Sequence, residues 1–172
     1  MTRVIRTSQV LSRREGLTSL EQIFLFEGAN PEAVGDVLLT APLVGSDSVF
    51  GRRPGEEIPR VGTSRALRGF SPAPGFRFDV ELTPQDEQVF LVHFSQPDRE
   101  VPYLQGDLVW RIADRPDGVV LDEQINTGQA FEVADEALTG PRPSLRRWLF
   151  FRVGHRQVMA RATANIAALL DA

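Results

Sequence analysis

The chain contains no cysteine and no lysine, and only two of its 172 residues are histidine. Without cysteine it has no disulfide, no thiolate nucleophile and no cysteine-ligated zinc or iron–sulfur centre. His93 and His155 do not stand in an H-E-x-x-H or comparable spacing, so we expect no metal site. All 19 basic residues are arginine, a bias that GC-rich bacterial genomes favour. These shortages leave a protein built from ordinary apolar and polar side chains.

Long apolar runs and excess positive charge are also missing. No run approaches the ~20 residues that span a bilayer, and arginines flank the apolar segment at 148–151. The first residues lack the apolar core of a signal peptide. A net charge of −4 disfavours nucleic-acid binding. We therefore predict a cytoplasmic protein with no membrane insertion and no nucleic-acid partner.

Nucleotide-binding and hydrolase motifs are absent as well. The sequence has no P-loop, no dinucleotide fingerprint and no Gly-x-Ser-x-Gly elbow, so we expect no cofactor.

What the sequence does contain is a succession of strand patterns. Residues 76–83 alternate between apolar side chains and charged ones, which is typical of a sheet with one buried face. Residues 115–118 (Arg-Pro-Asp-Gly) indicate a tight hairpin. The predicted strands are 20–26, 63–70, 76–83, 88–95, 103–113 and 118–127, and 42–62 is predicted to be loop. Residues 1–19 are either an extra strand or a loosely attached arm.

Two helices complete the prediction. Asn30, Pro31 and Glu32 supply an N-cap, a first-turn proline and an acidic first turn, and Pro42 ends this short helix. A longer helix is predicted over 144–170, where apolar residues recur every three or four positions. Its stripe is Trp148, Phe151, His155, Val158, Ala162, Ile166 and Leu169. The two patterns together predict an α+β fold, a curved antiparallel sheet wrapped around the C-terminal helix, with a short helix after the first strand.

This order of elements resembles the START-like, or helix-grip, superfamily, which includes polyketide cyclases/dehydrases, lipid-transport proteins and birch-pollen-allergen-like proteins. Three stretches carry the resemblance: residues 30–34 (Asn-Pro-Glu-Ala-Val), 61–65 (Val-Gly-Thr-Ser-Arg) and 103–108 (Tyr-Leu-Gln-Gly-Asp-Leu). It covers about residues 20–170, so we predict a single START-like domain over 20–172. Residues 1–19 have no counterpart in it.

The resemblance implies a cavity between the sheet and the long helix that holds a hydrophobic or aromatic small molecule. Its expected lining is Arg65, Phe78, Phe90, Tyr103, Trp110, Trp148, Phe151, His155 and Met159. Each has a simpler interpretation: the aromatic residues and Met159 as core, and Arg65 as half of a surface ion pair.

His155, His93 and Glu123 are the candidate catalytic residues. Histidine titrates near neutral pH, so either histidine is suited to acid–base work, although both also fit as structural residues. Glu123 belongs to an Asp-Glu pair that is expected to be solvated, yet it shares a strand face with Leu121 and Ile125. If it is buried there, its carboxyl group could act as a general acid.

Three functions remain open at this point. The leading one is binding or transport of a hydrophobic or aromatic small molecule without catalysis. The second is a polyketide cyclase/aromatase-like enzyme that uses acid–base chemistry. The third is a protein-interaction module of the chaperone-activator kind. Homodimer formation is also left open.

Overall fold

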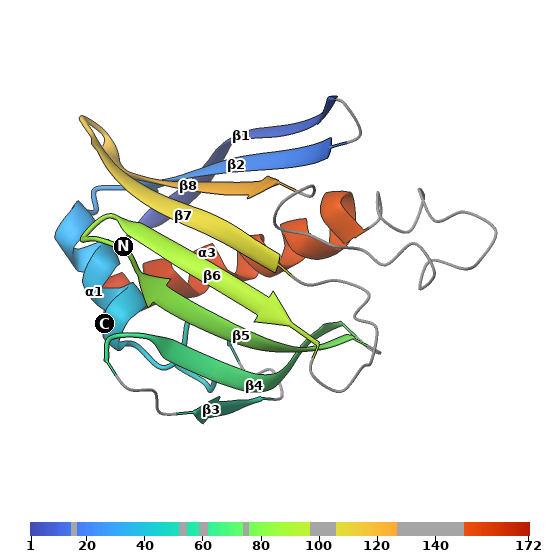
Figure 1. The fold of residues 1–172 in the computed structure, drawn as a ribbon. Helices are drawn as coiled ribbons and strands as arrows, with labels where there is room; N and C mark the ends of the chain where they lie inside the picture. Colours follow the sequence, from blue (N-terminus) through green and yellow to red (C-terminus); the bar gives the residue numbers. More distant parts are fainter. Residues whose placement is uncertain (15–16, 52–54, 59–61, 74–75, 97–105, 127–149) are drawn as a thin grey trace.

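The computed structural model describes residues 1–14, 17–51, 55–58, 62–73, 76–96, 106–126 and 150–172 (Figure 1). Eight antiparallel strands form one curved sheet in the order β1-β2-β8-β7-β6-β5-β4-β3. The strands are β1 (Arg3–Arg14), β2 (Leu17–Glu27), β3 (Glu56–Ile58), β4 (Arg65–Ala73), β5 (Phe76–Pro84), β6 (Val89–Ser95), β7 (Gly106–Arg115) and β8 (Gly118–Asn126). The helical elements are α1 (Pro31–Thr40), the π-helical turn η2 (Phe150–His155) and α3 (Arg156–Leu170).

The predicted α+β architecture is confirmed. The sheet bends around α3, which lies across its concave face (Figure 1). Alternate residues of the central strands are buried on that face, as the period-2 patterns predicted. From the β2 side to the β5 side they include Phe24, Leu121, Ile112, Phe90 and Leu82. The apolar faces of sheet and helix therefore form one core.

Strands β1 and β3 add to the predicted set. Residues 3–14 pair along β2 over almost their whole length, with a bulge between Arg6 and Ser8. β2 itself starts at Leu17, earlier than the predicted 20. A short strand, Glu56–Ile58, lies within the segment predicted to be loop and pairs with β4. How the chain divides into domains stays a prediction.

The short helix follows its sequence signals. The Asn30 side chain accepts a hydrogen bond from the backbone N–H of Ala33 at 2.8 Å, and Pro31 is the first helical residue. Val34 and Leu38 turn inward with no exposed surface, which fixes α1 at one end of the sheet.

The buried face of the C-terminal helix is rotated relative to the predicted stripe. His155, Met159, Ala162, Thr163, Ile166 and Ala167 form its buried face. Val158 and Leu169 are half-buried at the margins of that face, and Arg161 and Gln157 are exposed as expected. None of the helices in the described ranges has the length and apolar character that a membrane span requires. The predicted helical residues 144–149, including Trp148, lie outside the described residues.

Gly118 is a position with no room for a side chain. It begins β8 after the two-residue turn Pro116-Asp117, with a φ of 145°. A Cβ built on it would lie 2.1 Å from the carbonyl oxygen of Phe26 on β2. The close approach of these two backbones therefore requires glycine.

We predict that Gly118→Ala lowers the free energy of unfolding by roughly 2–4 kcal/mol, since either β2 or β8 must shift. Gly28→Ala is the matched control. Gly28 also has a positive φ, of 76°, but a Cβ at this position would have no neighbour within 4 Å. It should lose only about 1 kcal/mol, the strain of the left-handed conformation. Chemical denaturation of both variants tests this, and equal losses would contradict the steric explanation.

Candidate functional site

Glu123 is the centre of the candidate site, and its position follows from strand alternation. It lies on β8 between Leu121 and Ile125, all three with no exposed surface, and faces the concave side of the sheet. The expectation that it forms a solvated pair with Asp122 is therefore wrong for Glu123. A carboxylate in such a place is strongly destabilising unless hydrogen bonds compensate for the lost water.

Three side chains supply those hydrogen bonds. Gln22 of β2 donates from Nε2 to Glu123 Oε2 at 2.9 Å, and Trp110 of β7 donates from Nε1 to Oε1 at 3.0 Å. Gln22 and Trp110 are the cross-strand partners of Glu123 on either side, so the sheet register brings all three together. His155, at the junction of η2 and α3, places Nε2 2.9 Å from Glu123 Oε2. The cluster therefore joins three strands to the C-terminal helix.

The donors restrict where a proton can reside. An indole N–H only donates, and Gln22 presents its amide N–H₂ to the carboxyl group, so each Glu123 oxygen already accepts one hydrogen bond. The remaining contact, Oε2 to His155 Nε2, holds one proton that either partner can carry. Gln22 and Glu123 are fully buried, and His155 is 9% exposed. Chemically, the pair can donate or accept a proton in a largely apolar environment.

Four of the predicted lining residues lie in the same layer between sheet and helix. Phe78, Phe90, Trp110 and Met159 are each at most 4% exposed. Phe78 contacts Phe94 edge-to-face, with ring centroids 5.9 Å apart. These side chains are part of the hydrophobic core, and their contact with a ligand stays a prediction. Tyr103 and Trp148 lie outside the described residues, as does the side chain of Phe151.

His93 lies on the other face of the sheet. It is 48% exposed, and its Nδ1 contacts Asp107 Oδ1 at 2.5 Å across β6 and β7. An open hollow of about 530 Å³ lies there, with a lining that includes Ser64, Arg68, Asp79, Glu81, His93 and Ser95. Because Glu123 points to the opposite side, His93 cannot join the Glu123–His155 pair. Asp122 also points away from Glu123, and burial raises the pKa of its carboxyl group, with Arg111 acting against that shift.

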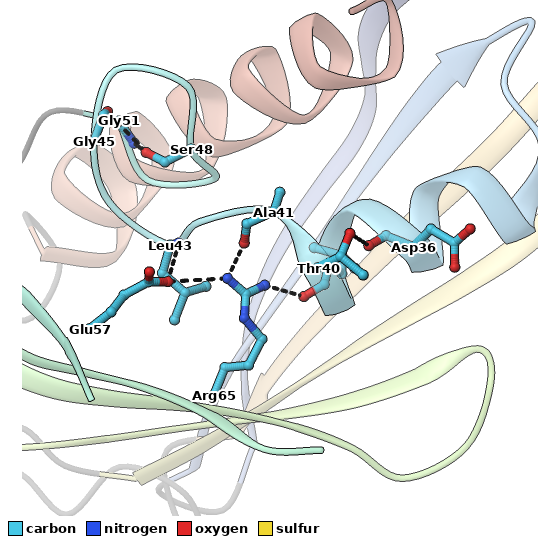
Figure 2. A network of polar contacts seen from close by, with 10 residues as sticks. Asp36, Thr40, Ala41, Leu43, Gly45, Ser48, Gly51, Glu57 and Arg65 are labelled. Atoms are coloured by element: carbon cyan, nitrogen blue, oxygen red, sulfur yellow. Dashed lines mark hydrogen bonds and ion pairs between the residues drawn. The ribbon is translucent and has the colours of Figure 1, made fainter. Parts of the chain in front are cut away.

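Arg65 binds the end of α1 (Figure 2). Its Nη1 donates to the carbonyl oxygen of Leu38 at 2.7 Å and its Nη2 to that of Ala41. Glu57 pairs with Nη2 at 3.2 Å and also accepts from the backbone N–H of Leu43. Burial lowers the pKa of the Arg65 guanidinium, and Glu57 opposes that shift. These bonds hold helix α1 against β4, whereas ligand binding by Arg65 stays a prediction.

Sequence reasoning missed Gln22, although the sequence carried a signal for it. Leu20, Phe24 and Phe26 alternate along β2, and Gln22 occupies the position where the pattern requires an apolar residue. Glu123 interrupts the pattern of β8 in the same way. Two polar residues at core positions of adjacent strands predict a buried hydrogen bond once the strands are known to pair.

Comparison with solved structures places this geometry in a known fold. Neither a protein-family model nor a curated protein matches the chain. Protein Ms6760 from Mycobacterium smegmatis is 14% identical, with a TM-score of 0.60 over 96% of this chain and 97% of that one. The ZhuI aromatase/cyclase from Streptomyces sp. R1128 is 14% identical, with a TM-score of 0.59 over 90% and 94%.

A third similar structure is the di-domain ARO/CYC BexL from the BE-7585A biosynthetic pathway. It is 14% identical, with a TM-score of 0.64 over 91% of this chain and 50% of BexL. The chain therefore has the START-like, helix-grip fold that its sequence resembled. At these identities the similarity defines the fold, and function rests on the chain's own residues.

We predict that Arg65→Met lowers the free energy of unfolding by roughly 2–4 kcal/mol, because the carbonyl oxygens of Leu38 and Ala41 lose their side-chain donor and Glu57 loses its ion-pair partner. Arg68→Met is the control: Arg68 is on the same strand but 68% exposed, and its contact with Asp79 is 3.6 Å long. It should change stability by less than about 1 kcal/mol. Urea denaturation measures both, and a loss for Arg65→Met no larger than that of the control would contradict the assignment.

Proposed function

We propose that this chain binds a hydrophobic or aromatic small molecule between its sheet and C-terminal helix, and that Glu123 and His155 recognise a polar group of that molecule. The observation that carries the proposal is the buried Glu123 carboxyl group with its three side-chain partners. Apolar residues at these positions would fill the core with no desolvation penalty. A buried charged cluster is therefore better explained by recognition than by stability.

The surroundings indicate the kind of ligand. Trp110 and Phe50 stand 6.4 Å apart between ring centroids, and Phe50 contacts Phe70 at 5.2 Å. Aromatic side chains beside one polar cluster are typical of sites that take flat, largely apolar molecules with few oxygen atoms. The solved structures of similar fold include aromatase/cyclases, which is consistent with such a ligand.

A second candidate is a cyclase/aromatase-like enzyme, and the 2.9 Å contact between His155 Nε2 and Glu123 Oε2 favours it. In this reaction class one carbon of a poly-β-keto chain loses a proton and bonds to a carbonyl carbon, and the oxygen of that carbonyl takes up a proton. His155 would take the proton from the carbon and return it to that oxygen, while Glu123 holds the imidazole in place. The pair suits proton transfer because both side chains are almost completely buried from water. Under either candidate a cytoplasmic location and homodimer formation stay predictions.

Ligand binding is tested with emodin, a trihydroxyanthraquinone, and with laurate, a fatty acid whose chain carries no oxygen, by displacement of 1-anilinonaphthalene-8-sulfonate. We expect saturable emodin binding, weakened about tenfold or more by His155→Asn and by Glu123→Gln. One lost charge-assisted hydrogen bond corresponds to about this factor. Laurate binding should change less than twofold. Circular dichroism confirms that both variants are folded.

The matched control is Gln157→Asn, an exposed polar substitution two residues from His155. It should leave emodin affinity unchanged. Absence of saturable binding by the wild-type protein, or equal affinities in wild type and both site variants, would exclude the proposal. If the site is catalytic, His155→Asn should also abolish cyclisation of a poly-β-keto thioester analogue.

A further inference from the structure

Two buried amide atoms beside the Glu123 cluster have no hydrogen-bond partner among the described residues. They are Oε1 of Gln22, an acceptor, and Nε2 of Gln9, a donor. Gln9 and Gln22 are cross-strand partners in the β1–β2 pair, and such partners project from the same face of a sheet. The residue with the orphan donor and the residue with the orphan acceptor are therefore neighbours on one face of the sheet. Native proteins leave few buried polar atoms in this state.

The orientation of Gln22 is fixed by its other neighbour. Its Nε2 donates to Glu123 Oε2 at 2.9 Å, and turning the amide over would place its Oε1 against a carboxyl oxygen. Oε1 must therefore face away from Glu123. The register continues this row across the concave face as Gln9, Gln22, Glu123 and Trp110. At one end of this row Trp110 Nε1 has a hydrogen-bond partner in Glu123. At the other end Gln9 Nε2 and Gln22 Oε1 have none among the described residues.

We propose that Gln9 and Gln22 together bind a hydroxyl group of the ligand, alcohol or phenol. A hydroxyl oxygen accepts from Gln9 Nε2, and its O–H donates to Gln22 Oε1. A carbonyl or ether oxygen satisfies Gln9 alone, and an ammonium group satisfies Gln22 alone. Of these common groups, the hydroxyl completes both orphan atoms at once.

This subsite rests on the proposed function and refines it, because it connects the ligand to the acid–base pair. The hydroxyl donates to Gln22, Gln22 donates to Glu123, and Glu123 contacts His155. Hydrogen bonds in such a chain polarise one another. A ligand hydroxyl bound by Gln9 and Gln22 therefore determines which part of the ligand lies nearest to Glu123 and His155.

The test compares emodin with its fully O-methylated ether, which keeps the ring system and the oxygen atoms but has no O–H to donate. We expect the wild-type protein to bind emodin at least tenfold more tightly than the ether. Gln9→Met should weaken emodin binding about fivefold or more, because the hydroxyl oxygen loses its donor, and emodin should still bind more tightly than the ether because its O–H still donates to Gln22. Gln9 is the informative position because Gln22→Met also removes the bond to Glu123. Gln157→Met, on the exposed side of α3, is the control and should leave emodin affinity unchanged.

Each outcome separates the two proposals. If neither compound binds, the proposed function fails. If both bind equally to wild type, the function stands and the hydroxyl subsite is overturned. If Gln9→Met leaves emodin affinity unchanged, the subsite is overturned as well. ¹⁵N-edited NMR of the glutamine side chains gives a further test. If Gln9 bonds directly to Gln22, or if only a water molecule bridges them, the Gln9 amide signals do not shift when emodin saturates the protein, and the subsite is overturned.

Discussion

The structure depends on how one carboxyl group is accommodated in an apolar core. Glu123 has no exposed surface, and hydrogen bonds from β2, β7 and the start of α3 compensate for the water it has lost. Such bonds require defined geometry, whereas apolar contacts tolerate small shifts. The cluster therefore sets how the C-terminal helix begins relative to the sheet. It also places a titratable pair where a ligand would find little water.

Stability alone does not explain such a cluster. Removing one partner of a buried charged group lowers stability, yet replacing the whole group by apolar residues of similar size is often neutral or stabilising. The incomplete Gln9 end strengthens this argument, because a cluster selected for stability would satisfy its own atoms. Arg65 illustrates the contrast. Its donors reach two backbone carbonyls and Glu57, so its role is explained by the helix that it holds.

Much of the fold could be predicted because local signals agree with the tertiary arrangement. The alternation of residues 76–83, the Asn30-Pro31 helix start and the turn before Gly118 all give the elements that the structure contains. β3 was missed because three residues surrounded by glycine and proline carry too little pattern. β1 stayed one of two alternatives because a polar edge strand and a loose arm have similar compositions.

The candidate site was predicted only in part. His155 and Glu123 were proposed separately, from a helix stripe and a strand face. Their contact depends on how far along the sheet the helix lies, which no local pattern encodes. Arg65 was considered as a ligand-binding residue because it is a cation near the start of a strand. Two of its partners are the backbone carbonyls of Leu38 in α1 and of Ala41 just after it, and such partners cannot be read from side-chain types. Gln9 and Gln22 become meaningful only once the β1–β2 register is known.

The most direct measurement of the central claim is the free energy of unfolding of the quadruple variant Gln22→Leu, Trp110→Phe, Glu123→Leu, His155→Leu, compared with wild type, because this variant removes all four polar members of the cluster. If the cluster exists for recognition, the apolar variant is equally stable or more stable, by up to about 4 kcal/mol. A loss of several kcal/mol would show that the Glu123 cluster is retained for stability and not for recognition, and would contradict the account.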